Sequence, residues 1–277
     1  MRAWIASVGI AAVAIHSVAS SAGFRTFTDQ PLHHAGLFFD RAALLLQGTS
    51  SLRRDRTASI ERIADFRPDD RMRVMAASTA LLAVEKREAS GQVHGWRCTA
   101  VLVAQDTLLT NHHCINLDGK QFDTGEVWFN YLAPQTADVY PVGTVLESDK
   151  ALDYAVLRVR LPHGHAAQRS LPLPSVRDAV PGERAIMVHH ANADVQQISR
   201  AFCRVAVEQP FDKTQIRHSC PMASGASGSL LIAETDGAII GLNHSVSRDP
   251  ATLNGFATSM TAILAHSARL RAHLVTQ

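Results

Sequence analysis

Three short segments of this 277-residue chain hold the residue types that nucleophilic hydrolysis requires. Such a reaction needs a hydroxyl group, a base beside it, a carboxylate that orients the base, and donors that stabilise the oxyanion. In chain order the segments are LLTNHHCI, ALDYAVLRV and MASGASGSLL. The candidates within them are His112 or His113, then Asp153, then Ser227.

The candidate serine lies in a loop with a glycine close by on each side. Gly225 and Gly228 permit a sharp backbone turn around Ser227. The amides of Gly225 and Ser227 are therefore expected to face one concavity and to stabilise an oxyanion. The loop is not the G-x-S-x-G elbow of α/β hydrolases, because residue 229 is serine. Ser224 and Ser229 are alternative nucleophiles, but neither is at the centre of the motif.

Together, these segments resemble the motifs of the trypsin-like serine peptidases. LTNHHC is similar to the family's T-A-A-H-C, LDYAVL to D-I-A-L-L, and GASGS to G-N-S-G-S. The order His, Asp, Ser is that of this family, and the spacings are 153 − 113 = 40 and 227 − 153 = 74 residues. These compact spacings, with PDDRMRV, HSCPMASGASGSL and IIGLNH, look like the bacterial glutamyl-endopeptidase branch. The resemblance covers roughly residues 68–270.

The resemblance implies a role for each candidate. In T-x-x-H-C the last histidine is the base, which selects His113 over His112. Adjacent residues on extended backbone also point in different directions, so only one of the two can face the serine. Asp153 is expected to orient the base, because its rival Asp149 lies in SDK without apolar flanks. Ser227 is then the nucleophile.

The start of the chain has the pattern of a secretory signal. Arg2 precedes an apolar run of 12 residues at 4–15, which is too short to span a bilayer comfortably, and small residues follow at 20–22. We expect residues 1–22 to be cleaved near Gly23, with a retained anchor as the alternative. A secreted or periplasmic protein without a stable membrane anchor is predicted.

Four cysteines lie in the predicted mature chain, and an even number in a secreted protein favours two disulfides. Four cysteines allow three pairings. The resemblance implies that Cys98 pairs with Cys114, next to the base, and that Cys203 pairs with Cys220, before the nucleophile loop.

The remaining pattern predicts an all-β protein. Short alternating strands begin near residue 72, and a Pro-rich connector spans 161–182. We predict two antiparallel six-stranded β-barrels of the trypsin-like type, at about 72–160 and 171–258, followed by a C-terminal α-helix at about 259–274 with Ser259 as its N-cap. Within this scheme 71–277 is the peptidase domain, and 23–70 is an N-terminal extension or pro-segment.

The sequence departs from the digestive members of the family near the nucleophile. Ala226 stands where those enzymes have the aspartate that pairs with a new N-terminus, so activation by that ion pair is not expected. The substrate pocket is expected to include Pro221, Met222, Asn243 and His244, none of which is a carboxylate. A small or apolar substrate side chain is therefore the default, although His244 leaves acidic specificity open.

Other classes of function are disfavoured. A net charge of +2 argues against nucleic-acid binding, which usually shows a concentrated basic face. Neither C-x-x-C nor H-E-x-x-H occurs, so no metal or other cofactor is expected, and the pairs at 33–34 and 189–190 are interpreted as ordinary surface or core histidines.

The predicted function is a secreted, monomeric serine endopeptidase that hydrolyses protein or peptide substrates through an acyl-enzyme. The alternatives are a catalytically silent binding protein and an esterase on the same fold.

Overall fold

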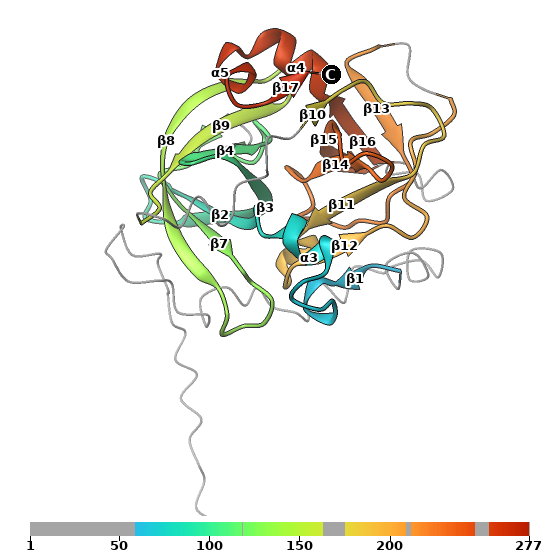
Figure 1. Cartoon of the computed structure of the whole chain (residues 1–277). Coiled ribbons are helices and arrows are strands. Elements are labelled where there is room, and N and C mark those ends of the chain that lie inside the picture. The colour runs from blue at the N-terminus through green and yellow to red at the C-terminus, as the bar shows by residue number, and fades with distance from the viewer. Residues whose placement is uncertain (1–58, 118, 163–174, 209–211, 247–254, 277) are drawn as a thin grey trace, which may run out of the picture.

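The computed structural model describes residues 59–117, 119–162, 175–208, 212–246 and 255–276 (Figure 1). It consists of two β units with short helices, so the all-β prediction is confirmed. The predicted signal, residues 23–58 of the predicted extension and most of the connector lie outside the described residues. None of the helices in the described part of the chain has the length and apolar character of a membrane span.

The first unit is a closed barrel of six strands in the order β2-β3-β4-β9-β8-β7. Closure leaves no strand edge unpaired, and the apolar side chains of successive strands fill the interior. A two-residue turn separates β3 from β4. The strands are β2 (Thr79–Arg87), β3 (Val93–Ala104), β4 (Thr107–Thr110), β7 (Thr124–Phe129), β8 (Asp138–Asp149) and β9 (Tyr154–Val159), and the small pair β5 (Asn116–Leu117) and β6 (Lys120–Gln121) lies outside the barrel.

The second unit is a nine-stranded sheet, called the second sheet below. Its main path is β1-β12-β11-β14-β15-β10-β17, and β16 joins β13 to β15. It differs from the predicted antiparallel barrel in that the two-residue strand β10 pairs in parallel with both β15 and β17. The strands are β1 (Glu61–Arg62), β10 (Ser175–Val176), β11 (Ala185–His189), β12 (Gln197–Ser199), β13 (Gln215–His218), β14 (Leu230–Ala233), β15 (Ile239–Val246), β16 (Gly255–Ser259) and β17 (Val275–Thr276).

The predicted C-terminal helix is present but is broken in two. Ser259 caps α4 (Met260–His266), as the sequence predicts, by accepting the amide of Ala262. Ser267 leaves helical geometry, with φ −91° and ψ 104°, and its hydroxyl caps α5 (Ala268–Arg271). A second capping serine within the predicted helix therefore starts a new helix.

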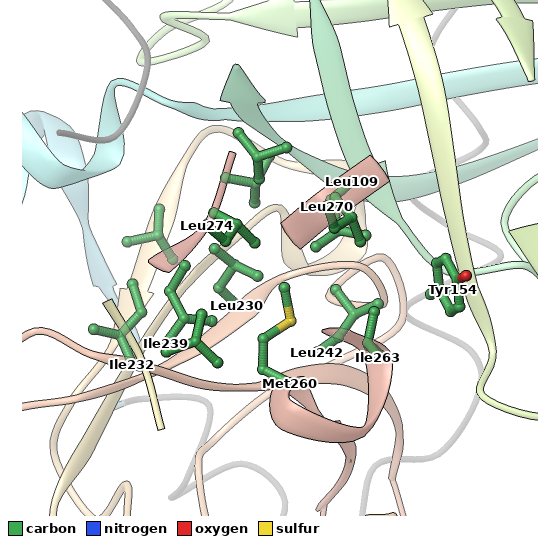
Figure 2. Packing of buried hydrophobic residues seen from close by; sticks show 14 of the residues in the cluster. Leu109, Tyr154, Leu230, Ile232, Ile239, Leu242, Met260, Ile263, Leu270 and Leu274 are labelled. Atoms are coloured by element: carbon green, nitrogen blue, oxygen red, sulfur yellow. The ribbon is translucent and has the colours of Figure 1, made fainter. Parts of the chain in front are cut away.

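The largest core cluster joins the two units. Figure 2 shows Leu109 and Tyr154 of the barrel packed in one cluster with Leu242, Met260 and Ile263 of the second sheet and α4. Burial of this shared apolar surface stabilises the two units against each other. The elements at their junction therefore hold a fixed relative position.

Residues 59–78, the first part of the described chain, pack on the second sheet. Strand β1 pairs with β12, and Glu61 accepts two hydrogen bonds from the guanidinium of Arg200 at 2.6 and 2.9 Å. Ile63, in the 3₁₀ helix η2 (Ile63–Asp65), is fully buried. Asp70 caps α3 (Arg71–Ala76). The end of the predicted extension thus contributes to the core.

Candidate active site

His113 lies in the turn that follows β4 and contacts Asp153 at two points. Its backbone N donates to Asp153 Oδ1 at 2.9 Å, and its ring Nδ1 lies 2.7 Å from Oδ2. The carboxylate therefore accepts the Nδ1 proton and leaves Nε2 as the basic nitrogen. His112, the neighbouring candidate, does not share this carboxylate contact in the structure.

Asp153 occupies an unusual backbone conformation for this contact. Its φ is +48°, in the left-handed region, which costs a residue other than glycine roughly 1–2 kcal/mol. Asn111 Nδ2 donates to the Asp153 carbonyl oxygen at 2.7 Å and stabilises this conformation. Asp149, the rival in the sequence, instead caps the preceding turn by accepting the Leu152 amide at 2.7 Å.

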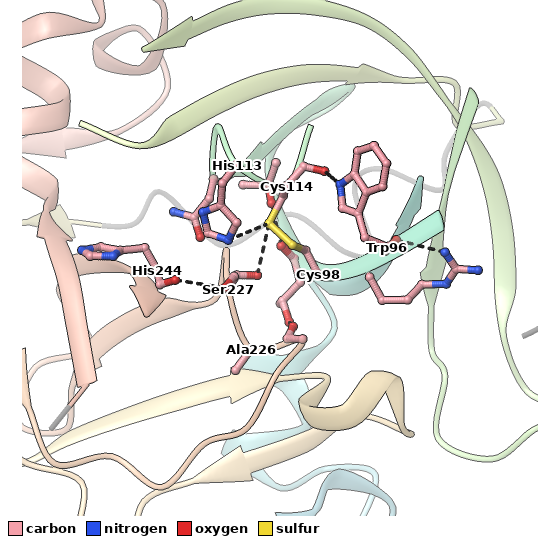
Figure 3. The surroundings of a disulfide bond; sticks show 12 residues. Trp96, Cys98, His113, Cys114, Ala226, Ser227 and His244 are labelled. Carbon is pink, nitrogen blue, oxygen red and sulfur yellow. Dashed lines mark hydrogen bonds between the residues drawn. A yellow bond between two sulfur atoms is a disulfide. The ribbon is translucent and has the colours of Figure 1, made fainter. Parts of the chain in front are cut away.

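Ser227 lies beside the imidazole at the disulfide between Cys98 and Cys114 (Figure 3). Cys114 Sγ lies 3.7 Å from His113 Nε2 and 4.0 Å from the Ser227 carbonyl oxygen. The Ser227 hydroxyl donates to the carbonyl oxygen of His244 at 3.1 Å. The structure thus brings the three predicted residues together, with the serine proton directed towards β15.

Thr99 of the barrel holds the loop that carries Ser227. Its backbone N donates to the Ser227 carbonyl oxygen at 2.7 Å, and its hydroxyl donates to the Gly225 carbonyl oxygen at 2.9 Å. Thr99 is fully buried and belongs to β3, so these bonds join the two β units at the site. Sequence reasoning missed this residue, although it directly follows Cys98.

In the loop that carries Ser227, some backbone amides donate to backbone carbonyl oxygens and others do not. Ala226 N donates to the Ala223 carbonyl oxygen at 3.2 Å, and Gly228 N donates to that of Asn243 at 2.9 Å. Across the described residues, neither the Gly225 nor the Ser227 amide donates to a backbone carbonyl. Gly225 has φ +94°, which glycine adopts without strain. These two amides, which are expected from the sequence to face an oxyanion, therefore have no backbone acceptor within the described residues.

Comparison with known families identifies the domain. Residues 98–242, a little over half of the chain, match the trypsin-like peptidase domain family. The chain belongs to this family. A search of curated protein sequences finds no match.

Two solved structures resemble this trypsin-like peptidase domain in fold. The active form of the Rv3671c protease from M. tuberculosis is 15% identical, with a TM-score of 0.51 over 75% of this chain and 88% of that chain. The inactive form of a serine-to-alanine mutant of Rv3671c is 14% identical, with a TM-score of 0.50 over 72% and 90%. At these identities the likeness concerns the fold.

The predicted pocket residues of this peptidase domain have two kinds of environment. Asn243 is buried and connects the loop to His218. Its Nδ2 donates to the Ala226 carbonyl oxygen at 2.9 Å, and its Oδ1 lies 3.2 Å from His218 Nε2. Met222 is half-buried and packs on Gly255, where an added β-carbon would lie 2.0 Å from Met222 Cε and 2.4 Å from His218 Cε1.

The other two pocket candidates contribute mainly through their carbonyl oxygens. Pro221 is buried, and its carbonyl oxygen accepts the Ser199 hydroxyl at 2.5 Å. The carbonyl oxygen of His244 accepts the Ser227 hydroxyl, while its ring Nε2 lies 2.8 Å from Gln215 Oε1. Burial lowers the pKa of the His244 imidazole, so the neutral ring is favoured.

Three fully buried histidines support the nucleophile loop. Burial lowers the pKa of His189 to about 3 and the pKa of His190 and His218 to about 4, so all three are neutral. His189 Nε2 lies 2.8 Å from the Ser199 hydroxyl, which contacts the loop, and His190 N donates to Thr99 Oγ1 at 3.1 Å. The interpretation of residues 189–190 as core histidines agrees with this burial.

One group has the spacing of a metal site. The ligand atoms of Cys98, His113 and Cys114 lie within 4.8 Å of one another. The two sulfurs are joined to each other, however, and a disulfide offers no thiolate to a metal. The second disulfide joins Cys203 to Cys220, so both pairings implied by the resemblance are present.

Proposed function

We propose that this chain is a secreted serine endopeptidase. Ser227 is the nucleophile, His113 is the general base, and Asp153 orients the imidazole and stabilises its protonated form. The amides of Gly225 and Ser227 bind the oxyanion. The observation that supports this proposal best is the two-point contact between His113 and Asp153. This contact turns His113 Nε2 away from the Asp153 carboxylate, to the side where Ser227 lies.

The proposed reaction proceeds in two halves. Ser227 Oγ forms a bond to the substrate carbonyl carbon as its proton passes to His113 Nε2. The tetrahedral intermediate then breaks the C–N bond, and His113 returns the proton to the leaving amine. Water attacks the acyl-enzyme by the same route and releases the acid. Protein or peptide substrates fit this chemistry.

One contact favours the alternative, a catalytically silent binding protein. The Ser227 hydroxyl donates to the His244 carbonyl oxygen, and this bond must break before the proton can reach His113. A neutral hydrogen bond contributes only about 1 kcal/mol net, and rotation about one side-chain torsion releases it. We therefore interpret this hydrogen bond as that of an enzyme without substrate, and not as that of an inactive binding protein. An esterase would share the same site and differ only in the bond that it cleaves.

For specificity we propose a small or apolar side chain next to the scissile bond. Met222 supplies an apolar surface, and Asn243 is occupied by His218 and the loop. Recognition of an acidic side chain, as the likeness to the glutamyl-endopeptidase branch would suggest, needs a cation. Burial lowers the pKa of His244 and disfavours its charged form. A neutral pocket discriminates mainly by size.

The proposed location is outside the cytoplasm, either periplasmic or secreted. The two disulfides are compatible with an oxidising compartment, where such bonds persist. Removal of residues 1–22 and a monomeric state are part of the same proposal.

Fluorophosphonate labelling of the purified protein, with mapping of the modified peptide, tests the function. We expect label on Ser227 and loss of label in Ser227→Ala and His113→Ala. Peptide hydrolysis should fall roughly 10⁴-fold or more in Ser227→Ala, because the triad acts as a unit. Ser224→Ala is the matched control, since Ser224 is exposed in the same loop. Absence of label after removal of residues 1–58, which precede the described part of the chain, would favour the binding protein. Turnover of esters without turnover of peptides would favour the esterase.

A further inference from the structure

One side chain of the C-terminal helix contacts both ends of the turn that carries Asp153. His266 is the last residue of α4. Its Nδ1 lies 2.9 Å from the Tyr154 hydroxyl, and its Nε2 lies 3.7 Å from Asp149 Oδ2. Asp149 and Tyr154 are partners across β8 and β9, where the turn begins and ends. A helix of the C-terminal segment thus closes a turn of the barrel.

The hydrogen bonds fix the role of each group. The Tyr154 hydroxyl donates to Glu147 Oε1, so it accepts the proton on His266 Nδ1. Burial, together with the bond to Glu147, raises the pKa of Tyr154, so the phenol stays protonated. The tyrosine ring is fully buried in the shared core. His266 therefore contacts a residue whose ring is fixed in the core, and not a mobile surface group.

Asp153 needs such support because its backbone is strained. Its φ of +48° persists only if the surrounding contacts hold it there. On the side of the catalytic histidine, His113 and Asn111 provide these contacts. On the opposite side, Tyr154 is joined to Asp153 by a single peptide bond, so a shift of the Tyr154 backbone would be transmitted to Asp153.

We propose that His266 is a positioning residue that acts through Tyr154 and Asp149 to hold the Asp153 carboxylate against His113. This inference rests on the proposed function, because it concerns the group that orients the catalytic base. The C-terminal helix is then part of the catalytic apparatus, although it supplies no group that touches the substrate.

The experiment compares His266→Ala with His273→Ala in the complete protein. His273 lies in the same C-terminal segment and serves as the control. In His266→Ala we expect kcat to fall about tenfold with KM little changed, because a misplaced orienting group weakens the transition state. We express kcat per active site titrated with the fluorophosphonate, so that a loss of folded enzyme is not counted as a loss of kcat. His266→Asn keeps a donor near the Nδ1 position and should restore kcat.

The outcomes separate this inference from the proposed function. Absence of fluorophosphonate label and of hydrolysis in the wild-type protein would contradict the proposed function itself. An active wild type, with His266→Ala and His273→Ala equal in kcat per active site, would overturn the positioning role alone. If His266→Ala does not fold, Tyr154→Phe decides, because it removes only the hydroxyl and retains the buried ring. An unchanged kcat in that variant would also overturn the inference.

Discussion

The hydroxyl of Thr99, in the barrel, donates to the carbonyl oxygen of Gly225, in the second sheet, at 2.9 Å. The Thr99 hydroxyl oxygen in turn accepts a hydrogen bond from the His190 amide at 3.1 Å. One buried hydroxyl thus fixes the position of the nucleophile loop relative to the strand that leads to Cys98. Because His113 and Ser227 come from different β units, this contact contributes to the distance between the proposed base and the proposed nucleophile.

Thr99→Val should therefore lower activity as well as stability. The substitution preserves shape but leaves the Gly225 carbonyl oxygen and the His190 amide without a partner, at a cost of about 1–3 kcal/mol for each buried group. The loop is expected to relax, so kcat should fall more than tenfold while the protein stays folded. Thr107→Val is the control, because the Thr107 hydroxyl donates to the side chain of the neighbouring Asp106 at 3.1 Å. Equal kcat values in the two variants would contradict this role of Thr99.

Gly228→Ala should prevent correct folding of the site. The new β-carbon would lie 2.0 Å from the Thr99 carbonyl oxygen and 2.5 Å from Thr110 Oγ1, so the loop and β3 would have to separate. Gly91→Ala is a matched control, because Gly91 has a similar φ of +84° but open space around its β-carbon position. Thermal unfolding should show a loss of about 1–2 kcal/mol for Gly91→Ala from backbone strain alone. A similar small loss for Gly228→Ala would show that the loop can move away from Thr99 at little cost.

The sequence was sufficient to select His113, Asp153 and Ser227, because each lies in a local motif with a recognisable order. The structure brings these residues together, and their catalytic roles stay predictions. The closed barrel followed from short alternating strands. The parallel pairs of β10 could not be predicted, because a strand of two residues has no periodicity.

The supporting residues were missed for a different reason. Thr99 and Gly225 are 126 positions apart, and Tyr154 and His266 are 112 apart. Such contacts leave no local pattern, since a buried threonine in a strand and a histidine at a helix end are both common. Only the shared core between the two β units brings them into reach.

Removal of the disulfide between Cys98 and Cys114 should cost activity as well as stability. It closes a sequence separation of 16 residues, and the other disulfide closes 17, so loss of either should cost a similar free energy of unfolding, about 3 kcal/mol. The first disulfide lies at the site, because Cys114 Sγ is 3.7 Å from His113 Nε2. We expect the double Cys→Ala variant at 98 and 114 to lose more kcat than the one at 203 and 220. Equal losses, measured at a temperature where both variants are folded, would assign the first disulfide to stability alone.

Acid should destabilise the protein through its buried histidines. In the unfolded chain these groups bind protons below a pH of about 6.5. In the folded protein, burial lowers the pKa of His189 to about 3 and of His190 and His218 to about 4. The unfolded state therefore binds more protons between these values. Stability is fully present above pH 6.5 and falls as the pH drops towards about 4.

Replacement of one buried histidine tests whether these residues cause the loss of stability in acid. Urea unfolding of His218→Gln, in a Ser227→Ala background that prevents self-digestion, should show a pH slope smaller than that of its parent by up to about 1.4 kcal/mol per pH unit. Glutamine keeps an amide donor near Asn243 and does not titrate. His94→Gln is the control, because the His94 side chain is 45% exposed. If the slopes of all three proteins coincide between pH 6.5 and 4, titration of His218 does not contribute to the acid sensitivity.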